Sequence, residues 1–456
     1  MPSSPELSRD LGPSHATAVV VGTIIGSGIF LVPAEMTQAV GSAKLVFLAW
    51  IVGGLLSFFG ALTYAELGAM RPQAGGEYVY VRDAYGPLPA FLYAWTWFVI
   101  AKPASIASVT TGIVRVLGTF PALAFLSVFI PHTRITYGQL VAIAATIFIS
   151  FLNYIGIKKA GDFQLFFTIL KIAIVLGIVA TGFCSSHGSW TNFSGTFIGA
   201  KGGLGGFMAA LVAALWAYDG WNDLNMVAGE VRNPERSIPL ALVAGVASVG
   251  ILYMLMNAAI QYAMPATAVA ASARPASDTT GLVFGATGAA IVSAAMALSM
   301  LVTLNGTTMS GARVPFAVAR DGYFFHSLAK VHPRFHTPST SIIVQAILSI
   351  FLLSLVGSFK QLFSLAIFAE WLFYMIAGST IFIFRRRETN VKSPYRIWGY
   401  PVIPAVFVCA AALLLYFTFS DNLMNSSVGL LIILAGIPVF YAFARKRLIS
   451  QVTHTL

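Results

Sequence analysis

Gly26, Ser27 and Gly28 are the residues of this sequence whose types and spacing most clearly suggest chemistry. They lie within GTIIGSGIF, residues 22–30, near the middle of an apolar segment at 15–40 that is long enough to cross a bilayer. Glycine and serine are poor helix formers, so we expect the helix to open here. An opened helix presents N–H groups to a carboxylate and carbonyls to an ammonium group, which predicts a site for a small zwitterion. The alternative is a glycine-lined contact between intact helices.

A second apolar segment, at 204–230, has the same irregularity. It reads LWAYDGWND at 215–223, with Asp219 and Gly220 in the middle. Glycine lowers helix propensity, and an acid at the bilayer centre is costly unless it faces a cavity or a partner. Two broken spans five helices apart predict an inverted repeat of five plus five helices, with a binding site between the breaks. The second break therefore favours an opened helix at residues 26–28 over a packing contact.

Charged residues inside other apolar segments are functional candidates, because a charge at membrane depth needs a partner or a cavity. They are Lys171 in FFTILKIAIVLG, Lys102 in IAKPASIAS and Glu370 in FAEWLFY. Glu370 is a gate element, a proton site or a packed neutral acid, and the sequence leaves these three roles open. At the ends of other segments we expect salt bridges of loops and gates rather than substrate ligands, formed by Glu66, Glu77 and Arg82.

The elements that must position these residues are membrane helices. Of the 456 residues, 57% are hydrophobic and only 9% are charged, against about 25% charged in soluble domains. The composition therefore predicts an all-α integral membrane protein. The net charge of +11 is typical of cytoplasmic loops that face anionic lipid, so we expect no nucleic acid partner. The two cysteines, Cys184 and Cys409, cannot form a disulfide scaffold.

We expect twelve transmembrane helices of the length that the hydrocarbon core requires. They lie at 15–40, 43–70, 87–117, 137–157, 161–184, 204–230, 237–263, 281–312, 338–357, 360–384, 401–419 and 427–444. With the N-terminus inside, 19 of the 27 lysines and arginines fall in cytoplasmic segments, so both termini are predicted to be cytoplasmic. The predicted organisation is a cytoplasmic segment at 1–14, five-helix repeats at 15–184 and 204–384, helices 11 and 12 at 401–444, and a cytoplasmic tail at 445–456.

No enzyme motif accompanies these helices. The glycines of GGLGG, residues 202–206, have no preceding strand and do not form a nucleotide loop. Pro333 interrupts the pair His332 and His336 in a predicted cytoplasmic loop, which disfavours a metal site. We therefore expect no catalytic residue, no metal and no cofactor.

Four stretches resemble the amino acid–polyamine–organocation (APC) superfamily of transporters. They are GTIIGSGIF (22–30), YAELGAMRPQAGGEYVYVRDAYG (64–86), WAYDGWNDLNMVAGEVRNPERSIPLAL (216–242) and GARVPFAVARDG (311–322). The stretches IAKPASIAS (100–108) and WAYDGWN are similar to the L-type amino acid transporter (LAT) branch, which includes light chains of heteromeric transporters and bacterial exchangers. The resemblance extends from the first predicted span to the ninth and weakens in the last two.

This resemblance implies a fold like that of the bacterial leucine transporter (LeuT), with helices 1 and 6 unwound. It implies that the substrate carboxylate binds the N–H groups of Gly26, Ser27 and Gly28. The ammonium group would bind carbonyls of Ile24, Trp216 and Asp219. The side-chain pocket would be shaped by Thr23, Ala101, Ser105, Trp216, Tyr218 and Asn222. Trp216 or Tyr218 would gate access from outside, and the alternative role of these aromatic rings is helix packing.

In sodium-coupled relatives of this fold a cation lies between helices 1, 5 and 8, and the resemblance implies that Lys171 replaces it. The Lys171 ammonium would bond freed carbonyls near Thr23 and Gly26. It would also bond the hydroxyl of Thr307 or Ser310, and transport would be sodium-independent. The alternative is a structural clamp with no part in the transport cycle.

The charge preference of the expected site stays open at this stage. Asp219 would pair with a basic substrate side chain, as in similar cation-accepting members, or its side chain would cap the opened helix. Lys102 would face the central path and repel or orient cationic groups. Alternatively, Lys102 would pair with Asp219 or Asp223 and leave the site neutral.

The sequence thus favours a secondary transporter of free L-amino acids, working by alternating access and sodium-independent exchange, for neutral and, as an open alternative, cationic substrates. Two further alternatives are a proton-coupled symporter, with Lys171 or Glu370 carrying the proton, and a membrane amino acid sensor. We expect a multi-pass protein of the cell (inner) membrane whose partners are the amino acid and the lipid bilayer. The loop at 118–136 lacks the cysteine that bonds the heavy chain in mammalian members, so we expect a bacterial-type protein without a disulfide-linked heavy chain. The expected oligomeric state is a monomer or a weak homodimer.

Overall fold

The computed structural model describes residues 6–355, 359–388, 393–421 and 423–455. The predicted segments 1–14, 338–357 and 445–456 each lie partly outside these residues. Within the described ranges every regular element is a helix, and three isolated β-bridges stand in place of strands.

The first half of the chain contains eight α-helices, and η1 joins two of them as a π-helical turn. In chain order these elements are α1 (Pro13–Ile24), α2 (Gly28–Val40), α3 (Ala43–Met70), α4 (Glu77–Tyr85), α5 (Pro87–Thr96), η1 (Trp97–Ala101), α6 (Lys102–Leu117), α7 (Tyr137–Tyr154) and α8 (Ile157–Phe183). The short 3-10 helices of this half are η2 (Pro121–Ser127) and η3 (Trp190–Ser194).

The second half begins with a helix that is again interrupted. Its α-helices are α9 (Gly203–Ala217), α10 (Asp223–Met226), α11 (Pro234–Ala263), α12 (Ala266–Ala271), α13 (Pro275–Gly311), α14 (Arg313–Arg320), α15 (Ser339–Leu355), α16 (Phe359–Arg387), α17 (Val402–Asp421) and α18 (Leu423–Thr455). Its short 3-10 helices are η4 (Ala228–Glu230) and η5 (His326–Ala329).

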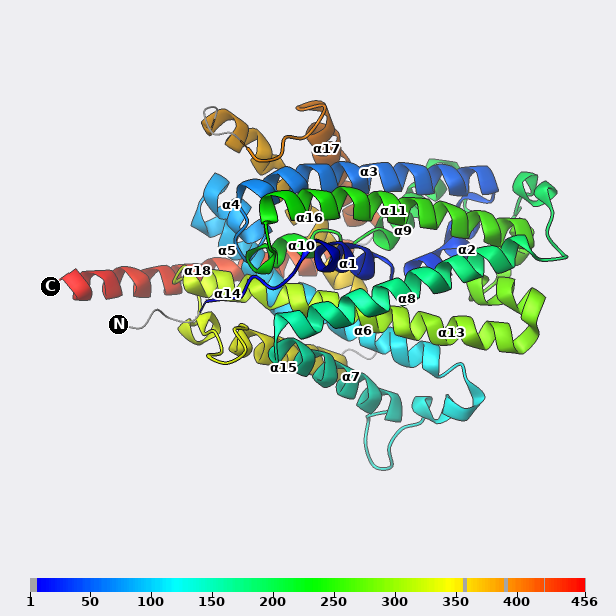
Figure 1. Ribbon diagram of the computed structural model, residues 1–456, viewed down its shortest axis with the longest axis horizontal. Coiled ribbons are helices and arrows are strands. Elements are labelled where there is room, and N and C mark those ends of the chain that lie inside the picture. Colours follow the sequence, from blue (N-terminus) through cyan, green and yellow to red (C-terminus); the bar gives the residue numbers. More distant parts are fainter. Residues whose placement is uncertain (1–5, 356–358, 389–392, 422, 456) are drawn as a thin grey trace.

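The long helices lie side by side along the longest dimension of the molecule (Figure 1). The first helix, α1, packs in the interior against α8, α11 and α13. The N-terminal and C-terminal ends are both at the left end of the bundle in Figure 1, as expected for termini on one side of a membrane. The loop at 272–274 and the start of α13 are at the opposite end.

Nine helices or interrupted helices of the described chain are long and apolar enough to cross a membrane. The predicted spans at 204–230 and 338–357 contain the shorter apolar helices α9 and α15, and the predicted span at 360–384 lies within α16. Large apolar side chains such as Phe148 and Ile347 are exposed on the outside of the bundle, as contact with lipid requires. The protein is a multi-pass integral membrane protein.

The two predicted helix breaks are confirmed, and they face each other. Helix α1 ends at Ile24 and α2 begins at Gly28, while α9 ends at Ala217 and α10 begins at Asp223. A Cβ on Gly28 would lie 2.9 Å from the Ala217 Cα atom, and a Cβ on Gly220 would lie 2.8 Å from the Thr23 Cγ2 atom. The backbones of the two broken segments therefore approach to a distance that only glycine allows.

Two further spans are less regular than the sequence predicts. The π-helical turn η1 precedes Pro103, whose ring lacks an N–H and crowds the carbonyl one turn earlier, so the preceding turn widens. Helix α13 begins at Pro275, before the predicted start at 281, and kinks at Gly285, where φ is 60°. The widened turn η1 ends directly before Lys102, one of the charged candidates.

Candidate substrate-binding site

A cavity of about 90 Å³ lies between the two helix breaks. Eight of the residues predicted to bind substrate line it: Thr23, Ile24, Gly26, Ser27, Gly28, Ser105, Trp216 and Asp219. The cavity is also lined by Lys102, Ser108, Val109, Ala217, Gly220, Asp223, Met300, Thr303, Thr307 and Glu370. The two breaks thus form one polar cavity inside an apolar bundle.

The break after α1 leaves two backbone donors available at this cavity. No described residue accepts a hydrogen bond from the N–H of Ser27 or Gly28, because they are the N-cap and the first residue of α2, whose N–H groups have no acceptor within the helix. Free N–H groups at a helix start suit a carboxylate. The Gly26 N–H differs from the expectation, because it donates to the Ile24 carbonyl at 2.7 Å. Two of the three expected carboxylate donors are therefore free.

The carbonyl ends of the two breaks are joined by Tyr253 of α11. Its hydroxyl lies 3.0 Å from the Ile24 carbonyl oxygen and 2.8 Å from the Ala217 carbonyl oxygen. The hydroxyl has one hydrogen, so it donates to one of these two oxygens at a time, and the Ile24 oxygen, an expected ammonium ligand, also accepts from the N–H of Gly26. No sequence pattern indicates Tyr253, because it is an isolated aromatic residue in an apolar span. It is a positioning residue that fixes the two broken ends relative to each other.

Lys171 of α8 contacts the other side of the α1 break. Its side chain is buried, and its ammonium donates to the carbonyl oxygens of Gly22 at 2.8 Å, Ile25 at 2.6 Å and Ser299 at 3.0 Å. Lys171 forms no ion pair with any described residue. Its charge is therefore stabilised by carbonyl dipoles, in the manner of a bound metal cation.

The expected hydroxyl partners of Lys171 need correction. Ser310 donates to the Thr307 carbonyl at 3.1 Å, and neither residue contacts the ammonium. Helix α13 instead meets the α1 break about two to three turns earlier, where Ser299 donates to the Ile25 carbonyl at 2.8 Å. Thr303 lies near the same carbonyls and lines the cavity. The sequence does not determine the turn at which this span crosses α1, which is why the prediction chose the wrong turn.

Lys102 forms a buried ion pair in the wall of the cavity. Its ammonium lies 2.5 Å from the Asp223 Oδ1 atom, so one of the two pairings left open by the sequence is present. The second carboxylate oxygen of Asp223 has no hydrogen-bond partner among the described residues. Asp219 and Glu370 line the same cavity. Three carboxyl groups thus share the cavity with one lysine.

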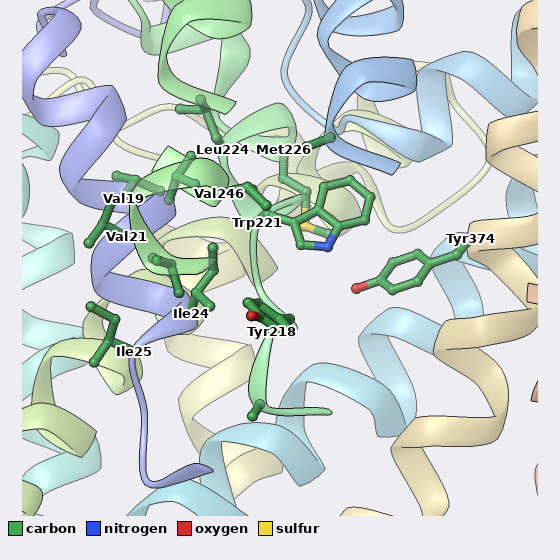
Figure 2. Close-up of a cluster of buried hydrophobic side chains, with 14 of the residues drawn as sticks. Val19, Val21, Ile24, Ile25, Tyr218, Trp221, Leu224, Met226, Val246 and Tyr374 are labelled. Atoms are coloured by element: carbon green, nitrogen blue, oxygen red, sulfur yellow. The ribbon is translucent and has the colours of Figure 1, made fainter. Parts of the chain in front are cut away.

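A chain of hydrogen bonds leads from the cavity to α4. The Tyr374 hydroxyl lies 2.8 Å from Asp219 Oδ1 and 3.0 Å from Asn222 Oδ1. The Asn222 side-chain amide donates to Glu77 Oε1 at 2.6 Å, and the Tyr93 hydroxyl donates to Glu77 Oε2 at 3.1 Å. Figure 2 shows Tyr374 directed from α16 toward the non-helical segment after α9. The chain therefore connects the cavity with a residue outside the membrane-spanning helices.

Three residues expected in the side-chain pocket do not line the cavity. Ala101 is fully buried at the end of the π-helical turn. Tyr218 points away and packs edge-on against Trp50, as its place in Figure 2 within the buried cluster illustrates. Asn222 is held by the hydrogen bonds to Tyr374 and Glu77. The non-helical segment has no regular periodicity from which these orientations could be predicted.

Ion pairs close the end of the bundle where the termini lie. The expected salt bridges of Glu66 and Arg82 are present, to Arg385 at 2.7 Å and to Asp321 at 2.7 Å. The expectation for Glu77 is wrong, because it forms hydrogen bonds and no ion pair with the described residues. The backbone of the N-terminal segment adds to this closure: the Leu11 N–H donates to the Glu230 carbonyl at 3.0 Å, and its carbonyl accepts the Arg232 N–H at 2.8 Å.

Burial raises the pKa of Glu77 from 4.5 to about 7, against the lowering by the hydrogen bond from Asn222. The folded protein therefore binds more protons than the unfolded chain between these pH values, and its stability falls as the pH rises through this window. We predict that Glu77→Gln flattens this part of the pH dependence. The melting temperature of the purified protein, measured from about pH 5 to about pH 8, checks it. If the melting temperature of Glu77→Gln depends on pH as in the unsubstituted protein, Glu77 is not the group that titrates in this window. The exposed Glu235→Gln serves as the control and should keep the unsubstituted pH dependence.

These features define a class of protein: a multi-pass membrane transporter with a polar cavity between two broken helices. The family model for amino acid permeases matches residues 11–443. The chain therefore belongs to the amino acid permease family, within the APC superfamily, and it is a LAT-like transporter and not an enzyme.

The similar proteins are amino acid transporters, and the similarity extends over almost their full lengths. The serine/threonine exchanger SteT of Bacillus subtilis is 31% identical over 446 residues, which cover 97% of this chain and 98% of SteT. The human b(0,+)-type amino acid transporter 1 is 32% identical over 458 residues, covering 98% of this chain and 90% of that protein. The human cystine/glutamate transporter is 30% identical over 440 residues, covering 96% and 86%.

Proposed function

We propose that this protein is a secondary active transporter that exchanges free L-amino acids across the cell membrane without sodium. The observation that carries this proposal is the pair of free N–H groups of Ser27 and Gly28, which face a cavity between two broken helices. They suit the carboxylate that every free amino acid has. The side chains of Thr23, Ser105 and Trp216 line the same cavity and would contact the rest of the substrate.

Sodium independence rests on Lys171. Its ammonium lies between α1, α8 and α13 and donates hydrogen bonds to three carbonyl oxygens. Oxygen atoms of this kind are the ligands that a sodium ion would need. A fixed positive charge in this position leaves no requirement for a bound metal cation. The exchange mechanism is supported by the similarity to the serine/threonine exchanger SteT.

The proposal includes the membrane arrangement. It has twelve spans with a LeuT-like five-plus-five inverted repeat at 15–184 and 204–384, and both termini are cytoplasmic. The two helix breaks and the position of the termini at one end of the bundle support it. The free cysteines, Cys184 and Cys409, lie outside the loop at 118–136, so we propose that the protein works without a disulfide-linked heavy chain.

The test is uptake of radiolabelled serine into proteoliposomes that are either preloaded with unlabelled amino acids or empty. Uptake only into preloaded vesicles, with equal rates in sodium and choline, supports the proposal. Uptake into empty vesicles that follows an imposed pH gradient contradicts it and favours the second candidate, a proton-coupled symporter. The observation that favours this second candidate is the set of three carboxyl groups that share the cavity with one lysine.

Asp219 is proposed to decide whether basic amino acids are accepted. Its carboxylate lines the cavity and accepts a hydrogen bond from Tyr374, but it forms no ion pair with a described residue because Lys102 pairs with Asp223. We predict that Asp219→Asn lowers arginine uptake about tenfold or more and leaves serine uptake within about twofold. Competition of each unlabelled amino acid against labelled serine measures this. An equal loss for both substrates indicates instead that the carboxylate only stabilises the opened helix.

A further inference from the structure

A second cavity adjoins the central one. It has a volume of about 530 Å³, and its lining residues include Ser27 and Met300, which also line the central cavity. The remaining walls come from α2, the last turns of α6, the loop at 272–274 and α13. These elements lie at the end of the bundle opposite the termini (Figure 1). We call this second cavity the vestibule, because it lies between the central cavity and this end of the bundle.

Two arginines give the vestibule its charge. Arg115 projects from α6 and Arg274 from the loop before α13, and both line the cavity. Neither guanidinium forms an ion pair with a described residue, and the one side-chain partner of Arg274 is the Ser293 hydroxyl, at 3.4 Å. Glu35 of α2 is the single carboxylate among the lining residues. Guanidinium groups bind carboxylates with charge-assisted, often bidentate hydrogen bonds. The vestibule is therefore suited to a molecule with a carboxylate.

The central cavity has the opposite charge balance. It contains Asp219, Asp223 and Glu370 against the single Lys102. A zwitterion in the vestibule would therefore be oriented, with its carboxylate at the arginines and its ammonium group toward the central cavity. Ser27 lies at the boundary of both cavities, and its free N–H offers the next position for the carboxylate.

We propose that Arg115 and Arg274 form a waiting site that binds the carboxylate of an amino acid before it moves to the Ser27 and Gly28 N–H groups. This proposal rests on the proposed transport function. The waiting site serves only the face opposite the termini, so the KM for substrate should differ between the two faces of the transporter. It acts on capture of substrate and not on the transport step itself.

The test compares the two faces of the double variant Arg115→Gln/Arg274→Gln. Serine uptake into intact cells gives KM at one face, and uptake into inside-out membrane vesicles gives KM at the other. We expect KM at the vestibule face to rise about tenfold, the opposite KM and the maximal rate to stay unchanged, and the difference to shrink at high salt. The control is Arg134→Gln, an exposed arginine that does not line the vestibule.

Three outcomes overturn the inference. The first is an unchanged KM at the vestibule face. The second is an equal rise at both faces, which shows damage to the central site. The third is loss of inhibition by external inorganic phosphate in the variant without any change in the serine KM, which assigns the arginines to another anion. Absence of serine exchange in the unsubstituted protein would contradict the proposed function itself and is therefore distinguishable from these outcomes.

Discussion

Lys171→Ala is expected to reduce amino acid exchange by roughly 100-fold or more, the factor that about 3 kcal/mol represents. The substitution removes the ammonium that bonds the carbonyls of Gly22, Ile25 and Ser299. These oxygens are buried at the α1 break, and an unsatisfied buried acceptor costs about 1–3 kcal/mol. The break then loses the charge that holds α1 against α8 and α13. Exchange of labelled serine in preloaded proteoliposomes measures the effect.

The control for this prediction is Lys158→Ala, which removes an exposed lysine from the first turn of the same helix. It should exchange serine at the normal rate. The melting temperature of the Lys171→Ala protein separates a loss of mechanism from a loss of folding. A folded Lys171→Ala protein with normal exchange would show that Lys171 has no part in transport.

Arg313→Met is expected to destabilise the fold by about 3–5 kcal/mol, because it leaves the Glu230 carboxylate buried without its partner. Both side chains are fully buried. The Arg313 guanidinium donates to the two Glu230 carboxylate oxygens at 2.7 Å and 3.0 Å, and to the Met309 carbonyl at 2.6 Å. The pair joins α14 to the segment that follows α10. Thermal unfolding of the detergent-purified protein should show a melting temperature lowered by several degrees.

A double substitution tests whether the unpaired Glu230 carboxylate causes the loss of stability. In Arg313→Met/Glu230→Gln the unpaired charge is gone, so part of the lost stability should return. Arg320→Met changes an exposed arginine of the same helix and should leave the melting temperature unchanged. If the double variant is no more stable than Arg313→Met, an unpaired charge is not the cause of the destabilisation.

The sequence predicted the parts of the site that depend on local chemistry. Gly26 to Gly28 and the Asp219–Gly220 pair are weak helix formers inside apolar segments, so both breaks could be placed within a few residues. Lys171 could be selected because a charge at membrane depth requires partners. The carbonyls that it bonds at the α1 break are next to Thr23 and Gly26, where the resemblance to the APC superfamily implied them.

The remaining parts of the site depend on contacts between distant segments. Tyr253 joins two helix ends although it looks like any other aromatic residue of an apolar span. Glu77 lies near charged loop residues in the sequence, yet the fold turns it inward to Asn222 and Tyr93. Whether Tyr218 faces the cavity is decided in a non-helical segment, where no 3.6-residue period applies.

The pairing of Leu11 with the backbone of residues 230–232 biases the resting equilibrium between conformations. Two backbone hydrogen bonds contribute about 1 kcal/mol each and burial of a leucine side chain about 2 kcal/mol. An opening of this end that separates Leu11 from residues 230–232 therefore costs about 4 kcal/mol. This free energy corresponds to a ratio of closed to opened molecules of roughly 1000 to 1. A ligand that binds only the opened form then has an apparent affinity reduced by that ratio. The pairing of Leu11 therefore stabilises the closed form of this end, by an amount that a ligand of an opened form would have to exceed.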